Sequence, residues 1–423
     1  MTERLLQFIW QFQHYNNREL NLVTGEQVVI IHQGIYNTNQ GPDFLQARIK
    51  IDATFLAGNI ELHVRTSDWQ KHRHSGDKNY QNVILHVVWE DDATGLKKET
   101  MPLLVLQNRV PGLLIRKYEQ WMNQVAFIPC SEQLREVNEL IWIGWKDRLL
   151  AERFLRASHA IQQNLKESTY HWEETFWWQL AHHFGASVNG AAFESLAKSI
   201  PYTILQKAKT QIHQLEALLF GQAGLLNKTF TGEYPRLLFS EYQFLKKKYT
   251  LQPICEQVYF LRMRPVNFPT VRIAQLSMLL HLSKPLFAQI REINDLKKIK
   301  KMFAVTANDY WHYHYLFEEE AACKPKNIGV QMIERLIINV VCPMLFAYGI
   351  EKGEPGYKIK AFNWLKELAA EKNAIIREFD RLTIKAANAC DSQSLLELKI
   401  QYCDHKRCLD CSIGHSILKN STP

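Results

Sequence analysis

Two alternating segments near the N-terminus, joined by a short polar loop, constrain the fold of this chain more than any other feature. Residues 45–51 alternate apolar and polar side chains, and residues 59–64 do so again. That period of two is typical of a strand with one buried face. The segment between them, Asp52 to Gly58, is short and ends in glycine. We therefore expect the two strands to pair antiparallel as a hairpin.

Each strand of this hairpin carries a carboxylate. Asp43 follows Pro42 at the start of the first strand, and Glu61 lies inside the second. Carboxylates that converge without a cationic partner repel each other, and a divalent cation relieves that repulsion. We expect Asp43 and Glu61 to bind Mg²⁺ or Mn²⁺. The alternative is structural: Asp43 caps the strand, and Glu61 forms a cross-strand ion pair with Arg48 or Arg65.

The segments around the hairpin predict an α/β domain. Residues 2–14 have apolar side chains at helical spacing, and residues 28–31 form a β-branched run that predicts a strand. Residues 83–89 are almost continuously apolar, as in a strand buried on both faces, and residues 102–106 predict a further strand. We expect residues 1–125 to fold around a mixed sheet.

A change of period after residue 125 predicts a second domain. At 423 residues the chain is longer than one hydrophobic core usually organises, so two or three domains are expected. Apolar residues recur at helical spacing through residues 126–423, which we expect to form an all-α domain. The expected helices cover residues 141–161, 172–184, 193–199, 204–220, 240–249, 272–282, 332–348, 357–368 and 392–402.

The order helix, strand, Pro-Asp, hairpin and Glu in the next strand resembles the core of the PD-(D/E)XK nuclease superfamily. The resemblance implies a restriction-endonuclease-like α/β domain at residues 1–125. In it, Asp43 and Glu61 would hold a metal ion that polarises the scissile phosphate and activates water. The superfamily has Lys two residues after the Glu, whereas this chain has His63. His63 can assist as base or ligand, and Arg65 on the same strand face can supply positive charge to the phosphate.

Four imidazoles occur close together in and after the second hairpin strand. They are His63, His72, His74 and His86, with Asp77 among them. Imidazole is the usual ligand of zinc or manganese, so this density suggests a second metal or a polar face that reads phosphate. The alternative is that His72 and His74 lie in a solvated loop and that His86 is a satisfied residue of the sheet.

Three cysteines cluster near the C-terminus. Cys403, Cys408 and Cys411 have spacings of x4 and x2, and His415 follows them. Thiolates this close together are most stable when they share a metal. Zinc bound by the three thiolates and His415 is one solution. A [4Fe-4S] cluster with a fourth thiolate from Cys130 is the other. A helix end with three reduced thiols is the alternative without a metal.

A net charge of +8, spread along the chain, points to a polyanionic partner. One segment with prolines at 265 and 269 carries Arg262, Arg264 and Arg272. A rigid arginine-rich loop is suited to phosphate contact or base stacking, so we expect these arginines to bind nucleic acid. Bracing of neighbouring helices by the same guanidinium groups is the alternative.

Several classes of protein lack support in the sequence. It contains no P-loop, no Gly-x-Gly-x-x-Gly motif, no nucleophile elbow and no kinase signature, so an ATP-driven or dinucleotide-using enzyme is unsupported. The N-terminus has no signal-peptide pattern, and we expect no stretch that approaches the ~18 to 20 apolar residues needed to span a bilayer. The expected location is the cytoplasm, without a membrane partner.

Longer blocks along nearly the whole chain are similar to the bacterial domain-of-unknown-function family 2851. They are residues 41–44, 58–63, 67–69, 82–88, 215–224, 262–265, 267–270 and 402–414. This resemblance implies no activity. The resemblance of the hairpin region to the nuclease core instead implies a metal-dependent nuclease or nuclease-derived protein that hydrolyses phosphodiester bonds in DNA or RNA. The alternative is a non-catalytic nucleic-acid-binding or scaffold protein that keeps the nuclease-like fold.

Overall fold

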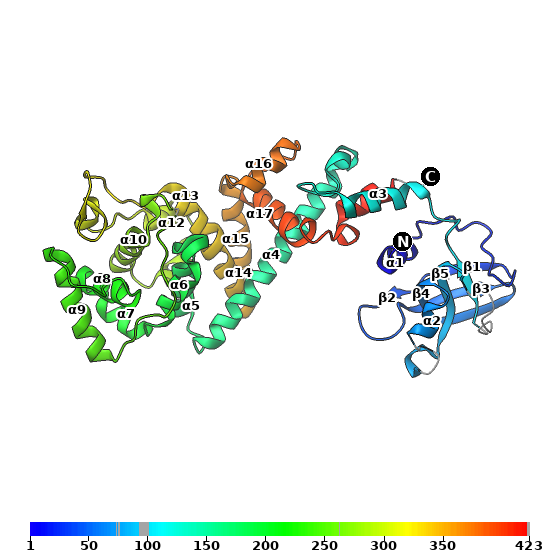
Figure 1. Cartoon of the computed structure of the whole chain (residues 1–423), viewed down its shortest axis with the longest axis horizontal. Helices are drawn as coiled ribbons and strands as arrows, with labels where there is room; N and C mark the ends of the chain where they lie inside the picture. The colour runs from blue at the N-terminus through cyan, green and yellow to red at the C-terminus, as the bar shows by residue number, and fades with distance from the viewer. Residues whose placement is uncertain (73, 75–76, 93–100, 262, 421–423) are drawn as a thin grey trace. The chain divides into compact units, whose positions relative to one another are not determined.

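The chain forms two compact units (Figure 1). Unit 1 comprises Met1–Asp147 together with Leu396–Pro423, and unit 2 comprises Arg148–Leu395. This computed structural model describes all residues except 73, 75–76, 93–100, 262 and 421–423. The sequence placed the division near residue 125 and assigned the cysteine-rich tail to the helical part. In the structure the tail is instead part of the same unit as the sheet.

Unit 1 is built on a mixed sheet with the strand order β1-β3-β4-β5-β6, in which β2 also pairs with β3. The strands are β1 Val28–His32, β2 Ile35–Tyr36, β3 Phe44–Ile51, β4 Thr54–Arg65, β5 Val83–Glu90 and β6 Leu103–Val105. The strands β1, β3 and β4 pair antiparallel, whereas β4, β5 and β6 pair parallel. The predicted mixed sheet is therefore confirmed.

The predicted hairpin is present, but its turn is shorter than expected. Strand β3 ends at Ile51 and pairs directly with Thr54, the first residue of β4. The expected loop over residues 52–58 is therefore wrong for residues 54–58, which belong to β4. Asp52 has a φ of +47°, and this left-handed backbone lets the chain reverse within two residues.

Helix α1, Glu3–Gln11, packs on the sheet against β4. It begins where the sequence predicts, because the Thr2 side chain accepts a hydrogen bond from the backbone N–H of Leu5. Its buried side chains include Leu5, Leu6 and Ile9, none of which has exposed surface. Among its described residues, the connection from β4 to β5 includes the short helix α2, Asp68–Lys71, and the 3-10 turn η2, Lys78–Tyr80.

The rest of unit 1 joins the segment after the sheet to the chain's tail. Its elements are α3 Gly112–Asn123, η3 Ser131–Glu136, the π-helix η7 Leu398–Cys403, η8 Cys408–Asp410 and α18 Ser412–Lys419. Helix α18 packs against α3 and η3, and Figure 1 shows the red tail beside the cyan α3. Arg4 in α1 also pairs with Asp410 at 2.5 Å. Because of these contacts, the tail belongs to the same compact unit as the sheet.

Helices dominate residues 139–397, which confirms the large helical region. They are α4 Glu139–Glu167, α5 Trp172–Phe184, α6 Ala186–Lys198, α7 Tyr202–Ala208, α8 Ile212–Gln222, α9 Glu233–Tyr249, α10 Pro269–Leu282, α11 Leu286–Glu292, α12 Leu296–Phe303, α13 Val330–Leu336, α14 Cys342–Glu351, α15 Pro355–Glu367, α16 Ala374–Arg381 and α17 Ala389–Glu397. A small hairpin, β7 His314–Leu316 and β8 Glu319–Glu320, interrupts the all-α character that the sequence predicts.

Two expected helices are interrupted in the structure. The helix expected over residues 204–220 is two helices, α7 and α8, because Lys209 leaves the helix to contact α10 and the residue after it. Its carbonyl lies 2.6 Å from the His281 ring, and its Nζ donates to the Ser283 carbonyl at 2.7 Å. The helix expected over residues 332–348 contains a π-helical turn, η6, Ile337–Val341, before Pro343. Proline has no N–H to continue the helical ladder.

Residues Val330–Glu351 also correct one expectation about membranes. Within the described part of the chain, this one helical segment of 22 residues is long and apolar enough to cross a bilayer. The sequence pattern predicts no such stretch. In the structure, 78% of its apolar window is buried inside the protein, as in a core helix.

Gly221 in α8 tests how tightly the core of unit 2 is packed. A Cβ atom at this position would lie 2.1 Å from the Tyr242 ring, which is fixed because its hydroxyl donates to Gln222 Oε1 at 2.9 Å. Gly221→Ala is expected to lower the free energy of unfolding by about 2 kcal/mol, since the ring must move. Gly356→Ala in α15 is the matched control because nothing lies within 4 Å of its added Cβ. Urea unfolding of both variants measures the difference, and equal midpoints would contradict this packing.

Candidate functional site

The hairpin brings Asp43 and Glu61 into direct contact. The backbone N–H of Asp43 donates to Glu61 Oε2 at 3.0 Å. Asp43 in turn accepts from the backbone N–H of Leu62 at 3.0 Å and from Gln7 Nε2 at 2.7 Å. One oxygen of each carboxylate is therefore held by the sheet itself, and α1 fixes the second oxygen of Asp43.

Burial makes this carboxylate pair costly to ionise. Glu61 is 5% exposed. Its pKa lies well above the ordinary value because the side chain is buried and because the Asp43 carboxylate adds repulsion. Burial also raises the pKa of Asp43, against the opposing hydrogen bond from Leu62. Near neutral pH the pair must therefore keep a proton or gain a cation.

The free oxygen of Glu61 faces imidazoles. Glu61 Oε1 lies 3.7 Å from His63 Nε2 and 3.5 Å from His74 Nε2. His63 has no exposed surface. Its Nδ1 lies 2.9 Å from His86 Nε2, and its Nε2 lies 3.1 Å from His72 Nδ1. A chain of rings thus extends from the buried sheet outward to His72.

Three of these histidines are arranged as metal ligands. One ring nitrogen from each of His63, His72 and His74 lies within 4.8 Å of the others. Among the described residues, the buried His74 Nε2 has no hydrogen-bond partner, and it lies 3.5 Å from Glu61 Oε1. Imidazole nitrogens combined with a carboxylate oxygen form a donor set that suits Mn²⁺, Fe²⁺ or Zn²⁺ better than Mg²⁺.

The environment keeps the buried rings neutral. Burial, and then the neighbouring imidazoles His86, His72 and His74, lower the pKa of His63 to about 3. Burial likewise lowers the pKa of His86 to about 4, and it lowers the pKa of His74. Neutral imidazole is the form that binds a metal. The rings therefore act as neutral donors at physiological pH.

Two aromatic side chains complete the site, and the sequence analysis assigned neither of them to it. The Trp69 ring packs 5.1 Å from the His86 ring and 5.3 Å from the His74 ring. The Tyr80 ring stacks on His74 at 3.9 Å. These contacts fix the His74 ring over the sheet. The connection that carries these two residues lacks apolar periodicity, so its pattern predicts no packing for them. In the sequence, Trp69 belongs only to the family resemblance at residues 67–69.

Arg65 has another partner in the structure. Its Nε lies 2.6 Å from Glu90 Oε1, on the residue that β5 places opposite it. Arg65 is 56% exposed, whereas Glu61 and His63 are buried. A cross-strand ion pair of the kind considered for Glu61 is therefore present further along β4, between Arg65 and Glu90.

The arginine-rich segment is only partly described, because Arg262 lies outside the described residues. Arg264 is exposed next to η4, Pro265–Asn267. Arg272 donates to Asn267 Oδ1 at 2.6 Å and to Gln275 Oε1 at 3.0 Å. Burial lowers the pKa of Arg272 to about 10. In this structure, Arg272 braces its own turn through these side chains, which differs from the bracing of neighbouring helices considered for it.

The structure places the predicted cysteine ligands of the tail and the predicted ligand His415 in different surroundings. Cys130 and the three tail cysteines are all in unit 1, each as a free thiol. The His415 ring lies against α1, with its centroid 4.0 Å from that of Phe12 and 5.3 Å from that of Phe8. His415 therefore packs among aromatic rings.

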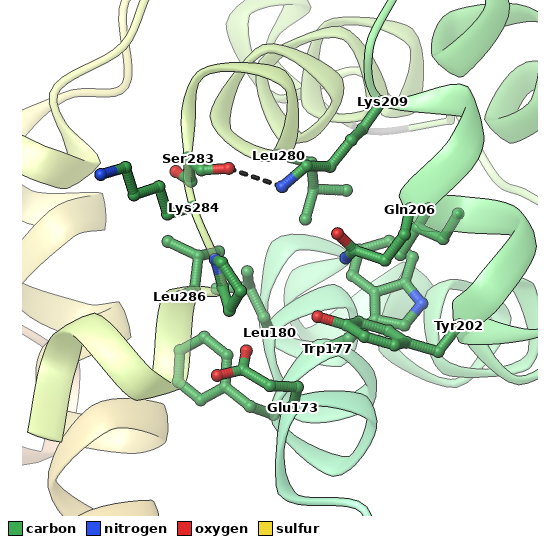
Figure 2. A pocket seen from close by; sticks show the side chains of 13 residues that line it. Glu173, Trp177, Leu180, Tyr202, Gln206, Lys209, Leu280, Ser283, Lys284 and Leu286 are labelled. Carbon is green, nitrogen blue, oxygen red and sulfur yellow. Dashed lines mark hydrogen bonds between the residues drawn. The ribbon is translucent and has the colours of Figure 1, made fainter.

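Figure 2 shows a cavity in unit 2 that contains none of the predicted site residues. Lys209 donates across it to the Ser283 carbonyl, and Glu173 accepts from the backbone N–H of Phe287 at 3.1 Å. Its volume of about 20 Å³ holds roughly one water molecule. This cavity is too small for a substrate.

Comparisons with known proteins identify a family but no characterised relative. A family model described as a protein of unknown function, DUF2851, matches residues 3–374. No curated protein and no solved structure matches the chain. The family match includes the whole carboxylate and histidine cluster and ends before the tail cysteines.

Proposed function

This chain belongs to the DUF2851 family, whose description assigns no activity. We propose that it is a metal-dependent hydrolase of phosphodiester bonds in DNA or RNA. The proposal rests on one observation. A buried, mutually repelling carboxylate pair faces a group of histidines whose ring nitrogens are close enough to share a metal ion.

The order of elements around the site supports the proposal. Helix α1, the antiparallel strands β1, β3 and β4, and a short crossover to the parallel strand β5 follow one another as in the nuclease core that the sequence resembles. Glu61 lies on the central strand β4, and Asp43 directly precedes β3. Central strands are buried and rigid, and such positions hold a metal site within narrow tolerances.

The residues present fit a divalent cation. Glu61, His63 and His74 would hold it, with Asp43 on the opposite side of Glu61. When bound, the ion would polarise a phosphate oxygen and lower the pKa of a water molecule. Gln7 and the Leu62 N–H orient Asp43. His86 fixes the ring of His63 by contacting its second nitrogen.

One observation favours the second candidate function, a non-catalytic nucleic-acid-binding or scaffold protein. Both ring nitrogens of His63 are already in contact with imidazoles, and the ring has no exposed surface. A lysine in a nuclease active site instead presents a mobile ammonium group to the reacting water. The metal-dependent cleavage assay distinguishes the two candidates.

Purified full-length protein is expected to cut DNA or RNA with Mn²⁺ and more slowly with Mg²⁺, because imidazole ligands suit Mn²⁺ better in this mixed donor set. Asp43→Asn removes one negative charge from the site and is expected to slow cleavage at least about a hundredfold. The assay compares single- and double-stranded DNA and RNA with each metal.

The matched control for this assay is Glu26→Gln, an exposed carboxylate of the same unit, which should cleave at the wild-type rate. Binding of Mn²⁺ is followed separately by the shift of the thermal unfolding midpoint. Bound nucleic acid without cleavage by any metal would favour the scaffold function over the hydrolase.

A further inference from the structure

The four cysteines of unit 1 lie at the ends of short elements that pack together. Cys130 directly precedes η3, and Cys411 directly precedes α18. Because α18 packs against η3, the two elements that Cys130 and Cys411 precede belong to one packed region despite their separation in sequence. Cys403 ends η7, and Cys408 begins η8, so both lie in the turn that leads to α18.

The thiols are close enough for each to act electrostatically on the others. Burial raises the pKa of Cys130, and the charges of Cys411 and Cys408 raise it further. Burial raises the pKa of Cys403, followed by the charges of Cys411, Cys130 and Cys408. Burial and Cys411 raise the pKa of Cys408 to about 12.

The backbone around the tail thiols is tightly wound, and it supplies donors to sulfur. A Cβ atom on Gly414 would lie 2.2 Å from the Cys408 carbonyl oxygen, so only glycine allows this approach. Burial raises the pKa of Cys411, whereas hydrogen bonds from the Gly414 and Ile413 backbones and the Trp145 side chain lower it. Donors aimed at sulfur stabilise its thiolate form, as around metal-bound cysteines.

The spacing of the thiols distinguishes between the two metal centres. Two sulfurs bound to one tetrahedral zinc lie roughly 3.8 Å apart, given the Zn–S bond length. Among the described residues, the only set of three or more ligand atoms within 4.8 Å of one another is the histidine group. No three of the described sulfur atoms therefore lie within 4.8 Å of one another, which is a wider arrangement than a single zinc ion requires.

We propose that a [4Fe-4S] cluster binds at the four thiols of unit 1, which are Cys130, Cys403, Cys408 and Cys411. The cluster fastens the tail to the segment between α3 and η3, and it binds in the thiolate form of each ligand with release of the protons. The site is separate from the carboxylate and histidine cluster, so it does not depend on the proposed hydrolase activity.

The test is the composition of full-length protein purified without oxygen. About four irons and about four sulfides per chain are expected, with a broad visible absorption from sulfur-to-iron charge transfer. Cys130→Ser is expected to reduce the iron to less than about a quarter of the wild-type content. Cys323→Ser, an exposed thiol of unit 2, should keep the full content.

A measurement on the wild-type protein keeps the test decisive if the Cys130 variant does not fold. The thiols are alkylated before and after removal of the cluster and are then identified by mass spectrometry. All four should be protected before removal and modified after it. One zinc per chain without iron, iron retained in Cys130→Ser, or alkylation of all four thiols in the protein as purified would each overturn the proposal. Loss of iron in His415→Ala with retention in Cys130→Ser would assign the fourth ligand to His415 instead.

Discussion

Glu61→Gln is expected to slow cleavage by about a thousandfold while making the metal-free protein more stable at pH 8. The two effects have one origin. Glu61 is 5% exposed and lies against the Asp43 backbone, so its charge is unfavourable without a cation and necessary for binding one. Glutamine keeps the shape and an acceptor oxygen but removes the charge.

The sign of the stability change follows from the direction of the pKa shift. The pKa of Glu61 is raised in the folded protein, first by burial and then by Asp43, so the folded state holds the proton more tightly than the unfolded state. The stabilisation by the bound proton is complete below the ordinary pKa of 4.5 and is lost as the pH rises toward the folded value. Metal-free wild-type protein should therefore lose stability from about pH 5 to pH 8.

The variant should lose much less over the same interval. At pH 8 its free energy of unfolding should exceed that of the metal-free wild type by about 2 kcal/mol. Saturating Mn²⁺ should stabilise the wild type and leave Glu61→Gln almost unchanged, because binding to the folded state adds to stability. Urea unfolding at both pH values, with and without Mn²⁺, provides the four comparisons.

Glu26→Gln is again the matched control, since this exposed carboxylate should change neither the pH dependence nor the response to Mn²⁺. A metal-free Glu61→Gln protein less stable than the wild type at pH 8 would show that the carboxylate is a structural hydrogen-bond acceptor. Cleavage at the wild-type rate in the same variant would remove Glu61 from the metal site.

The hairpin could be predicted because its information is local. Alternation along β3 and β4 determines which side chains face the core, and antiparallel pairing then places Asp43 beside Glu61. The short turn at Asp52 was missed because residues 54–58 are less regular in sequence than residues 59–64. Their strand geometry comes from pairing with β3, where Thr54 meets Ile51 and Gly58 meets Ala47.

The packing of the histidines could not be predicted, because it depends on contacts distant in sequence. His72 and His74 belong to a connection without hydrophobic periodicity, so the sequence does not specify where it lies. In the structure, Trp69 and Tyr80 pack on the rings and fold the connection over β4 and β5. The closeness of the four histidines in the sequence indicates that they are candidate metal ligands. Tertiary packing determines which of them lie near Glu61.

Cys130 illustrates the same difference between information that is local in sequence and contacts that form only in the folded chain. Spacing indicates that Cys403, Cys408 and Cys411 can share a ligand, because those residues are neighbours in the chain. The place of Cys130 depends on α18 packing against η3, an interaction between segments far apart in sequence. The division of the chain near residue 125 assumed that the tail follows the helices before it in space as well as in sequence. In the structure the tail instead joins the N-terminal segment in unit 1, so its place in space differs from its place in the sequence.

Position 63, where the nuclease resemblance expects lysine, is expected to be required for cleavage. His63→Ala should slow cleavage by about a thousandfold, because it removes a neutral ring nitrogen 3.7 Å from Glu61 Oε1 and the ring that contacts both His72 and His86. Arg65→Gln should slow cleavage less than about tenfold. Its guanidinium is exposed and paired with Glu90, and such pairs contribute little in water. Single-turnover cleavage at saturating substrate compares the two variants directly.

A titration with Mn²⁺ separates the two roles that His63 can have. If the ring is a metal ligand, His63→Ala should need a higher Mn²⁺ concentration and recover much of its rate when that concentration is reached. If the ring is the general base, the rate should stay low at every Mn²⁺ concentration. The contacts with Glu61 and His72, both in the group of metal donors, predict recovery. His32→Ala, which removes an exposed histidine of β1, is the control for loss of an imidazole elsewhere in the sheet. A thousandfold loss in Arg65→Gln with near-normal cleavage by His63→Ala would transfer the role of the lysine to Arg65.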